Sequence, residues 1–251
     1  MNSDTPDNTE KHPIEGPISR NLNRRMSRPI ASHIKDVSWL TPNRVSVIAL
    51  LFAILAAFSY SFGNLLMPGE WHAFGLFIIS PTLVIGGTLV QLSSIIDGVD
   101  GDLARIRSVS SDRGAIFDAV LDRYADIVIL VGIAYPLLRN ATDIEVLPGS
   151  PLNLMVSQDI VFIILVAAVL GSLMVSYSRA RLEAVELFSI HGWVSFGATR
   201  DVRLFLIFVC SLLSYTFIAL LMIAIMGNLT VLFRLLSILR KEKPEEDNQF
   251  A

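Results

Sequence analysis

Residues 97–122 read D-G-V-D-G-D-L-A-R-I-R-S-V-S-S-D-R-G-A-I-F-D-A-V-L-D, and both ends of this stretch adjoin long apolar segments. Asp97 and Asp100 are three residues apart. Asp118 and Asp122 are four apart, so each pair shares one face if its segment is helical. Each carboxylate buried in a membrane helix costs roughly 2.5–3.5 kcal/mol. A compensating cation is therefore expected, and a divalent metal ion is the natural candidate.

The composition indicates an integral membrane protein. Of the 251 residues, 53% are hydrophobic and 17% are charged, against about 25% charged in an ordinary soluble domain. The mean hydropathy is +0.58, and apolar runs of helix length recur, which excludes a soluble globule as the fold. The net charge is −3. We expect the lipid bilayer as the main surroundings and no nucleic-acid partner.

The apolar runs predict an all-α, polytopic membrane protein with six transmembrane helices. Thr41-Pro42 is a start signal for the first helix, and Pro81 and Gly86-Gly87 are expected to be kink or close-packing points of the second. The boundary between the last two helices is expected near 211–215, inside one long apolar run. The expected spans are 43–62, 73–96, 114–138, 159–181 and two within 202–239.

A basic amphipathic segment precedes the first span. Apolar residues recur every four positions from Ile18 to Ile34, and basic residues fill the other faces, which predicts an interfacial helix lying on the membrane surface. A solvated N-terminal arm is the alternative, because Pro29 interrupts the run. The expected division is a disordered tail over 1–15, a membrane domain over 16–240 and a mobile tail over 241–251.

The distribution of lysine and arginine predicts the orientation in the cell membrane. With the N-terminus inside, only Arg139 among the basic residues that flank the spans lies outside, and the loop 63–72 carries no basic residue. We therefore expect a multi-pass protein whose two termini and four aspartates are on the cytoplasmic side.

The four aspartates come from the facing ends of two consecutive helices. A short antiparallel connection brings such ends together, so we expect the carboxylates to converge. Oxygen ligands without cysteine or histidine favour Mg²⁺ or Mn²⁺ over zinc. The interleaved glycines Gly98, Gly101 and Gly114 allow close approach of a ligand, and Arg105 can pair with an anion that the metal also holds. This combination indicates a diphosphate substrate.

The spacing D-x2-D-G-x2-A-R-x8-G-x3-D-x3-D resembles the signature of the CDP-alcohol phosphotransferase family at every defined position. The matching residues are Asp97, Asp100, Gly101, Ala104, Arg105, Gly114, Asp118 and Asp122. Eight fixed positions at fixed offsets make this a specific signal. The resemblance implies an all-helical, six-span membrane enzyme, usually homodimeric, with an interfacial helix before the first span.

The resemblance also implies a role for each motif residue. Asp97, Asp100 and Asp118 bind metal that holds the CDP diphosphate. Asp118 and Asp122 help to hold a second metal ion, and Asp122 is the general base. The CDP pocket is lined by Gly101, Ala104, Arg105 and Gly114. In this chemistry an alcohol attacks the β-phosphorus of a CDP-linked donor, loses its proton to a carboxylate and releases CMP.

Two polar groups near membrane depth are candidates for the acceptor site. S-Y-S-R-A-R-L-E covers 176–183, and A-T-R-D-V-R covers 198–203. Their arginines are Arg179, Arg181, Arg200 and Arg203. An ordinary positive-inside flank is the alternative for each of them. The first group resembles the branch of the family that handles inositol phosphates, in which arginines at comparable places hold the phosphate of the acceptor.

Several alternatives remain open at this point. Glycerol 3-phosphate would suit the same arginines as an inositol phosphate. The donor is CDP-diacylglycerol, a CDP-ether lipid or a soluble CDP-alcohol. A cation-coupled transporter is the rival from a different class, although it does not explain the Gly-x2-Ala-Arg element. Outside the signature, Asp126 is expected to pair with Arg123, and Asp102 and Asp112 are expected to be solvated.

Overall fold

The computed structural model describes residues 18, 22–66, 69, 71–73, 77–139, 144–147, 154–185 and 199–241. Within these residues the fold is all-α apart from two short antiparallel hairpins. The helices are α1 (Arg24–Ile34), α2 (Pro42–Leu66), α3 (Pro81–Ile106), α4 (Asp112–Arg139), α5 (Gln158–Ala184), α7 (Arg200–Leu212) and α8 (Thr216–Lys241). The hairpins pair β1 (Trp71–Ala73) with β2 (Phe77–Ile79) and β3 (Ile144–Glu145) with β4 (Met155–Val156). The two predicted tails lie outside the described residues, except for Lys241.

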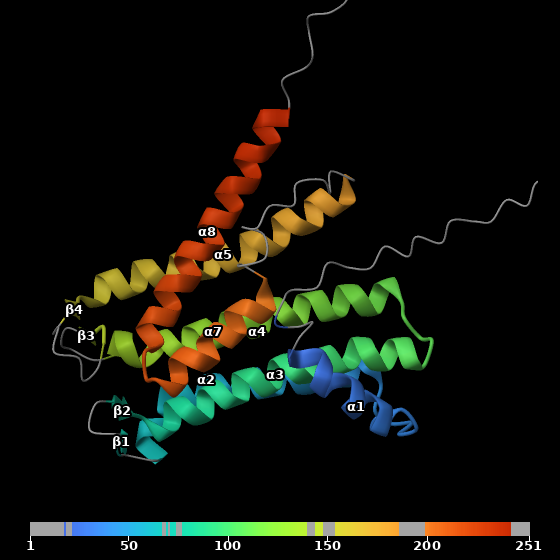
Figure 1. The fold of residues 1–251 in the computed structure, drawn as a ribbon, viewed down its shortest axis with the longest axis horizontal. Helices are drawn as coiled ribbons and strands as arrows, with labels where there is room; N and C mark the ends of the chain where they lie inside the picture. The colour runs from blue at the N-terminus through green and yellow to red at the C-terminus, as the bar shows by residue number, and fades with distance from the viewer. Residues whose placement is uncertain are drawn as a thin grey trace, which may run out of the picture.

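Helices α2, α3 and α4 run side by side, with α1 along the last turns of α3 and with α8 packed across α5 (Figure 1). Helix α7 lies against α3 and joins this layer to the pair formed by α5 and α8. The core between them is apolar and is drawn from several helices, as Tyr60, Val90, Ile129, Leu204 and Leu220 show. The site described below lies at the end of this bundle where α3 turns back into α4.

Glycines let the helices approach closely at two crossings. A Cβ at Gly132 of α4 would come within 2.6 Å of the Cα of Ala57 on α2. Gly171 of α5 and Gly227 of α8 face each other in the same way, because a Cβ on Gly227 would lie 2.9 Å from the carbonyl carbon of Gly171. Small residues at helix contacts are typical of membrane bundles.

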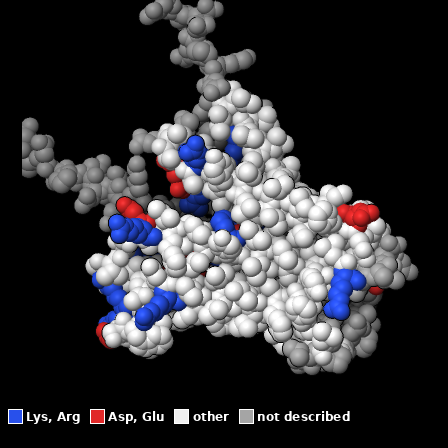
Figure 2. Space-filling view, turned by 180° about the vertical axis from the view of Figure 1, so that it is seen from behind, with Lys and Arg blue, Asp and Glu red and all other residues white. Residues whose placement is uncertain are grey.

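Four of the described helices are long and apolar enough to cross a membrane, and the spans are Pro42–Gly63, Pro81–Ile106, Gln158–Ala184 and Thr216–Leu239. Helix α4 has 28 residues but carries Asp122, Arg123 and Asp126 in its middle. Helix α7 has 13 residues. That gives a length of about 20 Å, against about 30 Å of hydrocarbon. Figure 2 shows a broad uncharged surface with most charged side chains gathered toward one edge. The protein is a multi-pass membrane protein.

The predicted start of the second span was wrong. Residues 71–73 and 77–79, which were expected to lead into and begin this helix, pair as a hairpin, and α3 begins only at Pro81. Ser80 has an extended backbone with φ −86° and ψ 119°, as a residue before proline prefers, and Pro81 then occupies the first turn instead of forming a kink. The helix runs on to Ile106, so Asp97 lies inside it and not at its end.

The other predicted helices match the structure closely. The first, third and fourth correspond to α2, α4 and α5, and the last two are separated at 213–215, within the predicted junction, where Ser214 has φ +61°. The amphipathic segment forms α1, which continues through Pro29. Its Met26 and Ile30 are exposed, whereas Ser27 is buried against α3, so α1 is not a loose arm.

Candidate functional site

Three carboxylates from α3 and α4 converge. Oxygens of Asp97, Asp100 and Asp118 all lie within 4.8 Å of one another. They meet because α3 ends at Ile106 and a short turn starts α4 at Asp112, which sets the two helices antiparallel. Asp118 Oδ1 is buried and has no hydrogen-bond partner among the described residues. An unpartnered buried oxygen within a group of hard oxygen ligands fits a divalent ion such as Mg²⁺ or Mn²⁺.

Asp122 lies outside this group of three and faces guanidinium groups. Its Oδ1 is 2.9 Å from Nη1 of Arg200, and its Oδ2 is 3.5 Å from Nη2 of Arg123. The same Nη1 of Arg200 is 2.7 Å from Asp97 Oδ2. Arg200, in the first turn of α7, thus links the carboxylates of α3 and α4. Its charge offsets part of the cost of burying several acidic groups together.

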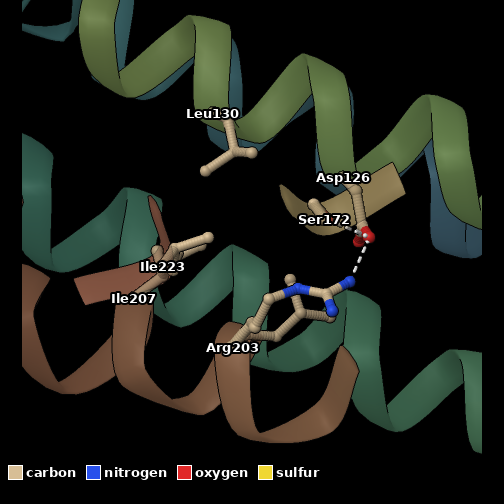
Figure 3. Close-up of a pocket in the computed structure, with 7 residues that line it drawn as sticks. Asp126, Leu130, Ser172, Arg203, Ile207 and Ile223 are labelled. Carbon is tan, nitrogen blue, oxygen red and sulfur yellow. Dashed lines mark hydrogen bonds and ion pairs between the residues drawn. The ribbon is translucent and has the colours of Figure 1, made fainter. Parts of the chain in front are cut away.

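A second ion-pair group lies one turn further along α4. Nη2 of Arg203 donates to Asp126 Oδ2 over 2.6 Å, and Ser172 Oγ of α5 donates to the same oxygen over 3.0 Å (Figure 3). Arg200 Nε donates to the other oxygen over 3.2 Å. The direct ion pairs of Asp126 are thus with Arg200 and Arg203, whereas Arg123, its expected partner, forms an ion pair with Asp122. Helix α7 brings both arginines across the bundle, and spacing within α4 does not reveal that contact.

The prediction of a solvated Asp102 was also wrong. Asp102 is 5% exposed, and its carboxylate accepts hydrogen bonds from Arg24, Ser27 and Arg105. Packing of α1 on this face of α3 removes it from solvent. Asp112, at the start of α4, is exposed as predicted.

The residues predicted for a CDP pocket lie beside the carboxylates. Among the described residues, a Cβ at Gly101 would meet only Arg105 Nη2, at 3.7 Å, so these residues leave this side of α3 open. A Cβ at Gly114 would lie 3.2 Å from Ser111 Oγ and 3.6 Å from Asn43 Oδ1. Ala104, another residue predicted to line the pocket, is half-buried. The room beside Gly101 is suited to a phosphate group that also reaches Arg105.

The four acceptor candidates separate into two pairs. Arg200 and Arg203 reach the carboxylates of α3 and α4, as described above. Arg179 and Arg181 each have a partner on their own helix, α5. Arg179 pairs with Glu183 at 2.9 Å, and Arg181 stands over the ring of Tyr177 at 5.9 Å.

Sequence reasoning missed two buried polar residues, one of which contacts the carboxylates. Ser46 of α2 donates a hydrogen bond to Asp100. Arg234 of α8 is 8% exposed and donates to the carbonyl of Val175 and to Ser178 Oγ, over 2.6 and 2.7 Å. A polar side chain inside an apolar helix is the only signal of such residues in the sequence, because their partners lie on other helices.

Comparison with known proteins places this arrangement in a family. The chain is 39% identical over 226 residues to the bifunctional IPC transferase and DIPP synthase of Rubrobacter xylanophilus, covering 90% of this chain but 43% of that protein. The chain thus spans less than half the length of this relative. It is 29% identical to the archaetidylinositol phosphate synthase of Pyrococcus horikoshii, over 78% of this chain and 81% of that protein.

The fold is also that of a solved protein. The phosphatidylinositol phosphate synthase of Mycobacterium tuberculosis with CDP-DAG bound matches with a TM-score of 0.63 and 21% identity, covering 90% of this chain and 99% of that chain. The same protein in complex with manganese and citrate matches with a TM-score of 0.63 and 21% identity, over 90% and 93% of the two chains. Residues 39–238, which include α2 to α7 and nearly all of α8, match the model of one family. This chain belongs to the CDP-alcohol phosphatidyltransferase family.

Proposed function

We propose that this protein transfers a phospho-alcohol group from a CDP-linked donor to a phosphorylated alcohol, of which inositol phosphate is the best candidate, and releases CMP. The observation that carries the proposal is the meeting of Asp97, Asp100 and Asp118 within 4.8 Å beside the open face at Gly101. The names of the Rubrobacter and Pyrococcus relatives support the inositol branch. Membership of the family disfavours the cation-coupled transporter.

The metal site would be formed by Asp97, Asp100 and Asp118, with Asp122 contributing to a second ion. Their donor atoms are all carboxylate oxygens, which suits Mg²⁺ or Mn²⁺. Manganese in the mycobacterial structure supports this choice. Such ions offset the charge of a diphosphate and of departing CMP.

Asp122 is the general base in this proposal. The acceptor hydroxyl gives its proton to the Asp122 carboxylate as its oxygen bonds to the β-phosphorus, and the bond from the β-phosphorus to the bridging oxygen breaks with loss of CMP. The ion pair with Arg200 at 2.9 Å supports an ionised carboxylate, which is the form that accepts a proton.

The donor's diphosphate would lie along Gly101, Ala104, Arg105 and Gly114. The glycines leave room for the phosphates, and the guanidinium of Arg105 supplies a charged donor of hydrogen bonds. CDP-diacylglycerol, a CDP-ether lipid and a soluble CDP-alcohol share this nucleotide end. The CDP-DAG bound to the mycobacterial protein makes a lipid donor the first to test.

The acceptor's phosphate would be held by Arg200 and Arg203, with Arg179 and Arg181 at the margin of the same site. Arg200 already contacts Asp122, so a phosphate bound to it would place the neighbouring hydroxyls beside the base. Glycerol 3-phosphate is the alternative acceptor, because it offers the same phosphate.

The proposed membrane arrangement adds α4 and α7 to the four apolar spans, which gives six. Neighbouring helices would shield α4 and α7 from lipid in part, because the ion pair between Asp126 of α4 and Arg203 of α7 is buried. Both termini and the carboxylates would face the cytoplasm, and the protein would act as a homodimer, as is usual for the family.

A panel assay tests this function. Purified full-length protein with Mn²⁺ receives CDP-diacylglycerol or CDP-inositol together with inositol phosphate, glycerol 3-phosphate, serine or a lipid alcohol, and CMP is measured by chromatography. We expect CMP release to be fastest with inositol phosphate. Cation flux in liposomes without CMP release from any pair would contradict the proposal.

A further inference from the structure

Helix α1 is attached to the motif helix α3 through a line of buried polar contacts. At its start, Asn23 donates to Ser94 Oγ over 2.9 Å and accepts from Gln91 Nε2 over 3.0 Å. One turn on, Ser27 is fully buried against Gly98, where an added Cβ would lie 3.4 Å from Ser27 Cβ. These contacts fix the position of α1 along the half of α3 that carries the motif.

Asp102 is the point at which this line of contacts meets the motif. Its Oδ2 accepts from Ser27 Oγ over 2.6 Å. Its Oδ1 accepts from Arg24 Nη1 over 2.5 Å and from Arg105 Nη2 over 2.8 Å. Two guanidinium groups, one from each helix, therefore share a single oxygen of a carboxylate that is itself buried.

The contact has a consequence for Arg105. A pair of opposite charges three residues apart on an exposed helix face usually contributes little to stability and leaves the side chains mobile. Here the acceptor is held in place from α1, so the direction of the guanidinium is set. The Arg105 side chain is nevertheless 51% exposed, and it stands next to the open face of Gly101. Arg105 is thus both held by the protein and accessible to a ligand.

We propose that Asp102 is a positioning residue that, together with Arg24 of α1, orients Arg105 toward the diphosphate of the donor. This inference rests on the proposed function. In this proposal α1 is part of the donor site, because loss of the Arg24–Asp102 contact would leave Asp102 free to move and Arg105 without a fixed orientation. The apolar residues Leu22, Met26 and Ile30 are exposed, so contact of α1 with a lipid surface would support the same contact.

The test measures nucleotide binding without turnover. Full-length protein in detergent is titrated with CDP in the presence of Mn²⁺ by calorimetry, and the variants are Asp102→Asn, Arg24→Gln and both together. Loss of one charge-assisted hydrogen bond should raise the Kd for CDP by roughly tenfold in each single variant. The double variant should bind no more weakly than the weaker single variant, because both changes break one linkage.

Arg25→Gln is the matched control, because it removes the same charge from an exposed neighbouring position on α1 and should bind CDP as the wild type does. In steady-state kinetics, Asp102→Asn should raise the KM for the donor and leave kcat and the KM for the acceptor unchanged. A lower melting temperature with an unchanged Kd for CDP would overturn the inference, and so would additive effects in the double variant.

Three further outcomes are also decisive. If Asp102→Asn does not fold, Arg24→Gln alone decides the question, because it leaves α3 intact. Wild-type protein that binds CDP and releases CMP, with an Arg24→Gln variant that binds CDP equally well, would overturn this inference and leave the proposed function standing. Failure of the wild type to bind CDP would overturn both.

Discussion

Chemically identical side chains take different roles in this protein according to the cation that they meet. Asp97, Asp100 and Asp118 face one another, and one buried oxygen, Asp118 Oδ1, has no hydrogen-bond partner in the part of the chain that the structure describes. Asp126 and Asp102 are as deeply buried, but guanidinium groups occupy their oxygens. A buried carboxylate must be compensated, and the unpartnered oxygen of the first group is where an ion that the protein does not itself supply would bind.

Replacing Asp122 by asparagine should abolish turnover and largely spare donor binding. The amide cannot accept the proton of the acceptor hydroxyl, whereas the group formed by Asp97, Asp100 and Asp118 stays intact. CMP release and the Kd for CDP measure the two effects. Asp112→Asn is the matched control, since Asp112 is exposed at the start of the same helix. Near-normal CMP release by the Asp122 variant would remove this residue from the base role.

Replacing Arg200 by glutamine should raise the KM for the acceptor far more than the KM for the donor. Loss of one charged contact to a phosphate corresponds to roughly tenfold or more. Steady-state kinetics with each substrate varied in turn provide the measurement, and Arg139→Gln, at the far end of α4, is the control. An equal rise in both constants would mean that Arg200 serves only to neutralise the carboxylates of α3 and α4.

At the scale of elements, Gly132 and Gly101 have different roles, the first in helix packing and the second in the proposed donor site. Gly132 lies where α4 crosses the backbone of α2, whereas a Cβ at Gly101 would meet, among the described residues, only the end of the Arg105 side chain at 3.7 Å. Gly132→Ala should destabilise the protein by about 1–3 kcal/mol, because a methyl group would overlap Ala57. Gly101→Ala should leave the melting temperature unchanged and weaken CDP binding. Thermal unfolding in detergent and CDP titration distinguish the two variants, and a stable Gly132→Ala protein would contradict the packing described here.

A contact could be predicted from the sequence when its residues are close together along the chain, and it was missed when they are far apart. Convergence of Asp97, Asp100 and Asp118 could be predicted, because helical spacing and one short turn are local features, whereas Asp122, also expected there, lies outside this group. The β1–β2 hairpin was missed, because residues 73–80 are apolar enough to continue a helix and only Pro81 signals the true start. The contacts of Asp126 with Arg203 and of Asp102 with Arg24 join residues more than 70 positions apart, and no local pattern reports them.

At the scale of the whole molecule, the short helix α7 joins two parts of the bundle. It packs on α3 and presents Arg200 and Arg203 to the carboxylates of α3 and α4. Thirteen residues are too few for an independent apolar span, and the ion pairs compensate its charged start. The predicted orientation places this charged end of the bundle toward the cytoplasm.

Cysteine labelling tests that orientation. An impermeant maleimide should label Asp112→Cys only in inverted vesicles and Arg139→Cys only in right-side-out vesicles, because the two residues lie at opposite ends of α4. The wild-type protein gives the background, since its single cysteine, Cys210, is buried. The reverse pattern of labelling would invert the topology and place the carboxylates outside.

The central claim is that the carboxylates of α3 and α4 bind divalent ions that hold the diphosphate of a nucleotide. The most direct measurement is a crystal structure of the protein with Mn²⁺ and CDP, in which anomalous scattering locates the metal. We predict a manganese peak at bonding distance, about 2.0–2.3 Å, from oxygens of Asp97, Asp100 and Asp118, with the diphosphate completing the coordination. Bound CDP with no manganese at these three residues would contradict the account.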